Sequence, residues 1–305
     1  MTTVTDTEVR VEVLDRHTVV DGLATHHLEA GPQDGPAVLL LHGGAWGECA
    51  RTTWTRTAAD LAAGGRRVLA PDWLGFGQSA KVRDFEDLGG RMLGHLASWL
   101  RATGVEEVDA VGLSMGGSHL LRALTAGPAL PVRRLVLVSA GGPPVDRSTG
   151  ARLMAYDGTV DSMREQVRLA VADPRWADDE AYVAARQEEA TRPGAWEWFT
   201  SLTVRAPWAP PPPGDAVPYE RIGVPTLVLA GARDPLKPAG FAETVAARIP
   251  GARLHVFPDA GHLPPLEAAG EFSAVLGDFL GTDPTTPPTT TPAAQPAPQD
   301  RSLPR

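Results

Sequence analysis

The sequence predicts an α/β fold in which a mainly parallel sheet carries helices on both faces. Short apolar runs alternate with amphipathic segments along most of the chain, which is the pattern of repeated strand–helix units. One long stretch interrupts this alternation and contains helical patterns alone. The length of 305 residues and the 43% hydrophobic content suffice for one such domain with an insertion.

Six apolar runs are predicted to form the strands of the sheet. The first is apolar at every position, as expected for a strand that is covered on both faces. The six runs lie at residues 37–41, 67–70, 108–111, 134–138, 226–230 and 253–257. Helical patterns accompany them near residues 54–64, 86–102, 116–126, 238–249 and 266–280.

The interruption divides the chain into four predicted parts. Residues 1–142 and 218–281 form the two halves of the core, and residues 143–217 form a helical cap inserted between two strands. Residues 282–305 are rich in proline and threonine and lack apolar periodicity. This tail is expected to be disordered, because it cannot bury enough surface to offset the entropy of ordering.

Composition and charge narrow the classes of partner. The net charge is −9 and lysine occurs only at Lys81 and Lys237, without a basic cluster, so nucleic acid is not expected as a partner. No apolar run approaches the roughly 20 residues that span a bilayer, and the N-terminus lacks the pattern of a secretory signal. Cys49 is the only cysteine, which excludes an internal disulfide and a cysteine-based metal site and agrees with a cytoplasmic setting.

The most informative stretch is the sequence VGLSMGG at residues 111–117, at the end of the third predicted strand. A G-x-S-x-G sequence between a strand and a helix forms a tight turn that lifts the serine hydroxyl above the edge of the sheet. The turn needs small neighbours, which Gly112 and Gly116 supply. Ser114 is therefore the predicted nucleophile, and a glycine-rich turn with an incidental serine is the alternative.

A nucleophilic serine needs a general base and a carboxylate that orients this base. Asp234 follows the fifth predicted strand in the sequence GARD, and His262 follows the sixth in DAGH. The ends of parallel strands meet at one edge of a sheet, so both side chains are expected near Ser114. We therefore predict Asp234 as the acid and His262 as the base, whereas His255 lies inside a strand and is interpreted as structural.

Two backbone N–H groups are predicted to bind the oxyanion that forms during attack on a carbonyl. The N–H of Met115 lies at the start of a helix, where the helix dipole favours negative charge. The second donor is expected in the sequence HGG at residues 42–44, where glycine lets the backbone approach a substrate closely. Gly44 is the predicted donor, Gly43 is predicted to contact the substrate, and Asp72 is interpreted as a structural turn residue.

The chain resembles the α/β-hydrolase superfamily over about residues 18–281 and, within it, the hydrolases that cleave a carbon–carbon bond in the products of meta ring cleavage. The stretches that carry the resemblance are LLHGG, APDWLGFG, SMGG, GARD and LHVF leading to GH. The resemblance implies a serine hydrolase with a Ser-Asp-His triad, no cofactor and no metal. Its implied substrate is a small molecule of the 2-hydroxy-6-oxo-dienoate type.

The sequence departs from this family around the substrate. Leu113 stands where the family usually has asparagine before the nucleophile, and Leu263 stands where tryptophan usually follows the catalytic histidine. Ala45, Trp46 and Gly47 replace a Gly-Pro-Gly sequence. Leu113 and Leu263 are expected to line and reshape the substrate pocket. Carboxylesterase or lactonase activity therefore stays open, as does a small-molecule receptor that retains the triad.

Arg186 in the predicted cap falls where the family keeps an arginine that contacts the substrate. The resemblance implies that its guanidinium binds the carboxylate end of a dienoate as a bidentate partner. The alternative is a solvated charge on a helix surface. The oligomeric state stays open, and a homo-oligomer is among the states that the sequence allows.

Overall fold

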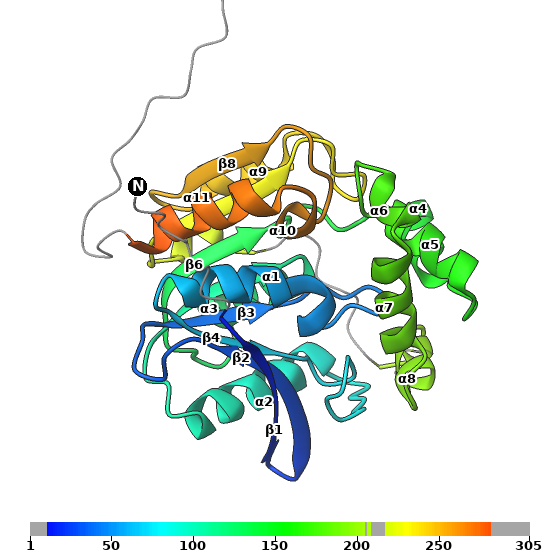
Figure 1. Cartoon of the computed structure of the whole chain (residues 1–305), viewed down its shortest axis with the longest axis horizontal. Coiled ribbons are helices and arrows are strands. Elements are labelled where there is room, and N and C mark those ends of the chain that lie inside the picture. The colour runs from blue at the N-terminus through cyan, green and yellow to red at the C-terminus, as the bar shows by residue number, and fades with distance from the viewer. Residues whose placement is uncertain (1–10, 205, 209–216, 282–305) are drawn as a thin grey trace, which may run out of the picture.

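The computed structural model describes residues 11–204, 206–208 and 217–281 (Figure 1). These residues form an eight-stranded sheet in the order β1-β2-β4-β3-β5-β6-β7-β8. β2 is antiparallel to β1 and to β4, and the other neighbouring strands are parallel. The predicted α/β fold class is confirmed. The strands are β1 (Val13–Val20), β2 (Leu23–Ala30), β3 (Ala37–Leu41), β4 (Arg67–Pro71), β5 (Val108–Leu113), β6 (Val132–Val138), β7 (Thr226–Gly231) and β8 (Arg253–Phe257).

Strands β3 to β8 match the six predicted runs, and the β1–β2 hairpin is an addition that apolar runs did not predict. β1 lies at the edge of the sheet and is mostly exposed or half-buried, so it lacks the continuous apolar sequence of the central strands. Asp21 and Gly22 connect the two strands with φ angles of 52° and 76°. Positive φ at both positions is typical of a two-residue hairpin loop.

The helices form two groups, of which the first covers the sheet. Within this group α1 packs against α11, and α2 packs against α3. Figure 1 shows the second group, α4 to α8, gathered at one side of the molecule; these five helices are called the cap below. The first group is α1 (Ala50–Ala63), α2 (Leu88–Ala102), α3 (Met115–Thr125), α9 (Phe241–Arg248), α10 (Pro264–Glu267) and α11 (Ala269–Gly281). The cap consists of α4 (Arg147–Met154), α5 (Val160–Arg168), α6 (Arg175–Asp178), α7 (Glu180–Ala190) and α8 (Ala195–Ser201).

Helix α7 of the cap has a well-defined start. The side chain of Asp179 accepts hydrogen bonds from the backbone N–H groups of Ala181 and Tyr182, both at 3.0 Å. An aspartate at this position satisfies N–H groups that have no partner inside the helix. Asp179 therefore fixes where α7 begins.

The topology brings the predicted site together at one edge of the sheet. β3, β5, β6, β7 and β8 are parallel, so their carboxyl ends lie on the same side. The segments that follow β3, β5, β7 and β8 carry Gly44, Ser114, Asp234 and His262 respectively. The central strands beneath them are fully buried, which gives these segments a close-packed support.

Three further predictions concern membrane spans, the C-terminal tail and the proline run of the cap. Among the described helices, none is both long enough and apolar enough to cross a membrane. The predicted disordered tail, residues 282–305, and the proline run at residues 210–213 lie outside the described residues.

Candidate active site

Ser114 occupies a strained turn between β5 and α3. Its backbone has φ 49° and ψ −110°, and its N–H donates to Val138 O at 2.8 Å. A side chain on Gly112 would place its Cβ 2.4 Å from the nitrogen of Gly117, and one on Gly116 would lie 2.5 Å from Leu41 O. Both positions therefore require glycine. A non-glycine residue at positive φ costs free energy, and such strain is concentrated at functional sites.

Asp234 and His262 form a buried pair on the same edge of the sheet as this turn. Asp234 Oδ2 lies 2.8 Å from His262 Nδ1, and Asp234 Oδ1 accepts from the backbone N–H of Leu236 at 2.8 Å. The side chains of Asp234 and His262 are 3% and 5% exposed. One carboxylate oxygen is thus fixed by the backbone while the other orients the imidazole. Nδ1 of His262 is engaged, which leaves Nε2 as the nitrogen for proton transfer.

The hydroxyl of Ser114 is not hydrogen-bonded to His262 among the described residues. The bond between nucleophile and base is often long in a site without substrate and shortens in the complex. The structure thus brings Asp234 and His262 into contact and places Ser114 on the same edge of the sheet. Their roles in catalysis stay predictions.

Glu267 holds the loop of His262 against the cap, a role that the sequence analysis did not predict. Its Oε1 accepts from Gly261 N at 2.8 Å, and its Oε2 accepts from Ala172 N at 2.6 Å. The N–H of His262 itself donates to Ala170 O at 2.8 Å. Burial raises the pKa of the Glu267 carboxyl, although backbone N–H groups stabilise its charge. A glutamate five residues after the histidine was the only signal for this role in the sequence.

The two predicted oxyanion donors lie side by side. A Cβ placed on Gly44 would lie 2.7 Å from Sδ and 3.2 Å from Cβ of Met115, so only glycine fits there without displacing Met115. Within the described part of the chain, the N–H groups of Gly44 and Met115 have no hydrogen-bond partner. Two adjacent unpaired N–H groups next to Ser114 have the character of an oxyanion hole.

His42 orients the peptide group that contains the Gly44 N–H. Its Nδ1 donates to Gly43 O at 2.8 Å, and its Nε2 accepts from Trp73 N at 3.1 Å. These partners require the neutral ring with the proton on Nδ1, and complete burial lowers the pKa of His42 accordingly. The Gly43 carbonyl and the Gly44 N–H belong to one planar trans peptide and point in opposite directions. His42 therefore restrains the direction of the Gly44 N–H from one side of the loop.

Gly43 contacts Glu48, a buried residue at the end of the same loop. A Cβ on Gly43 would lie 2.3 Å from Glu48 Oε2, and this oxygen accepts from Ala45 N at 2.9 Å. A contact between Gly43 and substrate stays a prediction, and the observed role of this glycine is to make room for Glu48. Neither His42 nor Glu48 was predicted from the sequence as a site residue, although His42 is part of the HGG motif.

Arg186 lies on α7 and is 1% exposed, so it is not a solvated surface charge. Its Nε and Nη2 donate to Trp46 O at 3.0 and 2.6 Å, and its Nη1 donates to the hydroxyl of Tyr182 at 3.1 Å. The Nε/Nη2 edge, which would form a bidentate bond to a carboxylate, is thus used by a backbone carbonyl. A contact with a substrate carboxylate stays a prediction and would need the remaining donors of Nη1 and Nη2.

The other singled-out residues belong to the packed interior. Leu113 at the end of β5 and Leu263 after His262 are both buried, with 0% and 3% exposure, and their contact with substrate stays a prediction. Asp72 is structural, as the sequence analysis interprets it. It accepts from Ala50 N at 2.8 Å and from Gln78 N at 2.9 Å.

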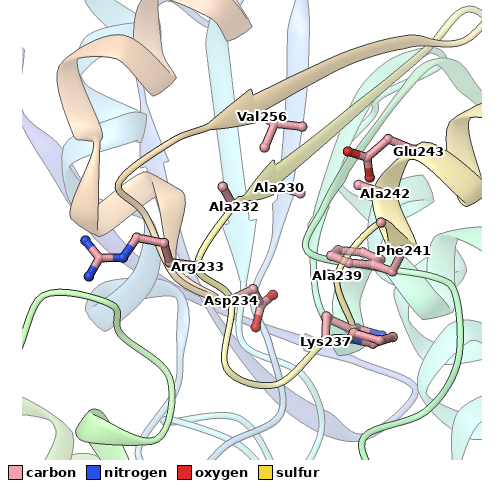
Figure 2. Close-up of a pocket in the computed structure, with 13 residues that line it drawn as sticks. Ala230, Ala232, Arg233, Asp234, Lys237, Ala239, Phe241, Ala242, Glu243 and Val256 are labelled. Carbon is pink, nitrogen blue, oxygen red and sulfur yellow. The ribbon is translucent and has the colours of Figure 1, made fainter. Parts of the chain in front are cut away.

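A pocket of about 440 Å³ borders the loop of Asp234 (Figure 2). Figure 2 shows Asp234 near the middle of this loop and Lys237 farther along it. Lys237 Nζ donates to Gly141 O and Pro143 O at 2.7 and 3.2 Å and so ties this loop to the segment after β6. The predicted nucleophile does not line this pocket, so we do not assign it to the substrate. Among the described residues no group of three His, Cys, Asp or Glu side chains could hold a metal ion.

Comparisons with known proteins agree with this architecture. The model of the alpha/beta hydrolase family matches residues 38–275. The chain is 30% identical to the 2-hydroxymuconate semialdehyde hydrolase of Pseudomonas sp. (strain CF600), over 88% of this chain and 94% of that protein. It is also 30% identical to the 2-hydroxy-6-oxo-2,4-heptadienoate hydrolase of Pseudomonas putida, over 91% of this chain and 99% of that protein.

A solved structure extends the similarity to three dimensions. The 2-hydroxy-6-oxo-6-phenylhexa-2,4-dienoate hydrolase of Rhodococcus sp. strain RHA1 matches with a TM-score of 0.76 and 26% identity, over 89% of this chain and 100% of that one. The family match, the sequence identity and the shared fold cover most of the chain. The protein is a hydrolase and belongs to the alpha/beta hydrolase family.

Proposed function

We propose that this protein is a serine hydrolase that cleaves a carbon–carbon bond in a 2-hydroxy-6-oxo-dienoate. The observation that carries the proposal is the 2.8 Å bond between His262 Nδ1 and Asp234 Oδ2, at the edge of the sheet where Ser114 occupies a strained turn. The names of the similar proteins support the substrate class, because two of them are hydrolases of 2-hydroxy-6-oxo-dienoates.

Once the dienoate is in its keto form, acylation of Ser114 begins with proton transfer. His262 Nε2 takes the proton of Ser114 while the serine oxygen attacks the C6 carbonyl of the substrate, and Asp234 stabilises the imidazolium. The N–H groups of Gly44 and Met115 bind the resulting oxyanion. Donors of this kind contribute roughly 3–4 kcal/mol each in measured cases.

A carbon leaving group needs a place for its electron pair. Transfer of the 2-hydroxyl proton to C5 first converts the dienoate to its 2-keto form. When the C5–C6 bond then breaks, the electron pair on C5 is delocalised through the C3–C4 double bond into the 2-keto group, and C6 stays on Ser114 as an ester. The dienolate takes up the proton that His262 received from Ser114 and leaves as the 2-hydroxy-dienoate. His262 is then neutral again and activates a water molecule, which hydrolyses the ester and regenerates the serine.

An uncharged ester or lactone is the second candidate substrate. The specific observation in its favour is the use of the Nε/Nη2 edge of Arg186 by Trp46 O, which leaves fewer donors for a substrate carboxylate. Ester hydrolysis would use the same triad and oxyanion donors. An alkoxide would leave in place of a carbon, so no electron sink in the substrate would be required.

A substrate panel tests both candidates. Turnover is measured on a coloured dienoate ring-cleavage product, on p-nitrophenyl esters and on lactones. We expect the dienoate to give the highest kcat/KM and Ser114→Ala to abolish its turnover. Ser98→Ala is the matched control, because Ser98 lies on α2 and its hydroxyl accepts a bond from Arg101. Higher kcat/KM on esters would favour the second candidate, and no turnover of any substrate would favour a receptor.

A further inference from the structure

The cap is tied to the backbone of the loop that follows β3 through Arg186. Two nitrogens of this guanidinium, Nε and Nη2, converge on one carbonyl oxygen, Trp46 O. Nη1 donates to Tyr182, which lies one turn away on the same helix. Charged donors make stronger hydrogen bonds than neutral ones, and burial from water strengthens them further. The connection between α7 and Trp46 is therefore firm.

The contact between the loop and α7 also involves the backbone. Gly47 has φ +69°, and a Cβ at this position would lie 2.0 Å from the carbonyl oxygen of Arg186. The indole ring of Trp46 stacks on Phe199 of α8, with centroids 3.8 Å apart and planes at 25°. Tyr156, between α4 and α5, contacts the same indole at 4.9 Å. The cap thus holds Trp46 by both its ring and its carbonyl.

Trp46 lies two residues after the predicted oxyanion donor Gly44. Three side chains hold backbone groups of this short loop: His42 bonds to Gly43 O, Glu48 to Ala45 N, and Arg186 to Trp46 O. Two of these side chains belong to the core, and Arg186 belongs to the cap. Loss of the Arg186 bond would therefore release the far end of this loop from the cap, while His42 and Glu48 still hold the near end.

We propose that Arg186 is a positioning residue for the oxyanion hole, which it couples to the docked position of the cap. The inference rests on the proposed serine hydrolase function and assigns Arg186 a role that is independent of any charge on the substrate. Through Trp46, the arginine keeps the Gly44 N–H directed at the reacting carbonyl only while α7 is docked on the core.

An uncharged substrate separates this role from the binding of a substrate carboxylate. p-Nitrophenyl acetate cannot form an ion pair with Arg186. We expect Arg186→Ala to lower kcat for this ester about 10- to 100-fold, because a small displacement of a catalytic group has an effect of this size. KM should change less than about twofold, since the oxyanion exists only in the transition state. Arg186→Lys should restore part of kcat, because an ammonium can donate to Trp46 O but not as a fork.

A second measurement probes the oxyanion hole without turnover. A trifluoromethyl ketone forms a hemiketal with Ser114 and places its oxyanion in the hole, so its affinity should fall in parallel with kcat. Gly47→Ala should produce the same selective loss of kcat by pushing α7 away from the loop. Circular dichroism and thermal unfolding identify any variant that does not fold.

Arg164→Ala is the matched control, since Arg164 is a cap arginine that bonds to Ala177 O and Glu180 within the cap. It should retain the wild-type kcat. A folded Arg186→Ala protein that keeps the ester kcat and the ketone affinity would overturn this inference alone. A wild-type protein without turnover on the whole panel would overturn the proposed function and this inference with it.

Discussion

Two histidine–aspartate pairs in this protein share their geometry and differ in their surroundings. Nδ1 of His262 lies 2.8 Å from Asp234, and Nδ1 of His26 lies 2.7 Å from Asp72. The second ring nitrogen distinguishes them. Nε2 of His26 lies 2.8 Å from Asp15, whereas Nε2 of His262 has no hydrogen-bond partner in the described part of the chain.

The number of carboxylate partners decides what each histidine can do. Burial lowers the pKa of His26, but the hydrogen bonds to Asp72 and Asp15 outweigh burial and the pKa is raised. Both ring nitrogens of His26 face carboxylate oxygens, which only accept hydrogen bonds, so both nitrogens carry protons in this arrangement and neither can accept one. His26 acts instead as a buried cation that connects β1 and β2 to the turn after β4. His262, with one carboxylate, is oriented and keeps Nε2 for proton transfer.

The largest effect is the loss of kcat that we expect when the hydrogen bond between His262 and Asp234 is broken. Asp234→Asn should lower kcat about 10⁴-fold, because an amide cannot stabilise the imidazolium or hold its tautomer. Ser114→Ala and His262→Ala should have effects of similar size, and the combined losses should be far from additive. Steady-state kinetics on the best substrate of the panel measures these effects. His26→Gln, assayed in the same way, should keep the wild-type kcat, and a comparable loss in this variant would contradict the distinction between the pairs.

The second effect is the loss of stability that we expect when the pair of His26 and Asp72 is broken. Asp72→Asn should lower the free energy of unfolding by about 3–5 kcal/mol, because it leaves a buried cation without its main partner. The measurement is urea denaturation at neutral pH. Asp60→Asn on the exposed face of α1 is the control, since its ion pair with Arg56 is solvated. A loss below about 1 kcal/mol for Asp72→Asn would show that His26 is neutral in the folded protein.

The third effect is the pH dependence of the His26 pair. Because the folded-state pKa of His26 is raised above 6.5, its stabilising contribution is complete below that pH and is lost as pH rises through the folded-state pKa. Asp72 has a lowered pKa, so its contribution is lost as pH falls below about 3.8 and through its folded-state pKa. The stability difference between wild type and His26→Gln should therefore be larger at pH 5 than at pH 9. Equal differences at the two pH values would contradict the charge assignment.

The smallest effect is expected at Ser139, which is compared here with Ser114. Both serines follow neighbouring strands of the sheet, and the comparison again depends on which hydrogen-bond partners a side chain has. Ser139, after β6, has φ 49° like Ser114, and its buried hydroxyl has no hydrogen-bond partner. Ser139→Gly should raise the free energy of unfolding by about 1 kcal/mol, because it removes both the strain and the unpaired hydroxyl. Thermal unfolding measures the change. A lower melting temperature would indicate that the Ser139 hydroxyl has a stabilising role.

The sequence order was sufficient to predict which residues meet at the sheet edge. Strands that alternate with helices are parallel, so Ser114, Asp234 and His262 had to follow strands with a common carboxyl edge. The β1–β2 hairpin was missed because an exposed edge strand has no continuous apolar run, although the Asp21-Gly22 dipeptide was a usable turn signal.

Contacts between distant segments could not be predicted in this way. Arg186 bonds to a carbonyl 140 positions earlier in the chain, and Glu267 bonds to Ala172, which is 95 positions away. Backbone carbonyls and N–H groups are the same at every residue, so no sequence pattern identifies them as partners. The two carboxylates around His26 are likewise hidden, because Asp15, His26 and Asp72 lie on separate elements.

The close contact of Gly47 with α7 has a consequence for the engineering of this hydrolase. Replacing the cap with the cap of a relative assumes that the cap is an independent module and that it affects substrate specificity alone. Here the graft would also replace α7, whose backbone carbonyl at Arg186 lies against Gly47 and whose Arg186 side chain holds Trp46 O. A functional chimera therefore has to transplant the loop at residues 42–48 together with the cap, and the smallest exchangeable unit of this protein spans both.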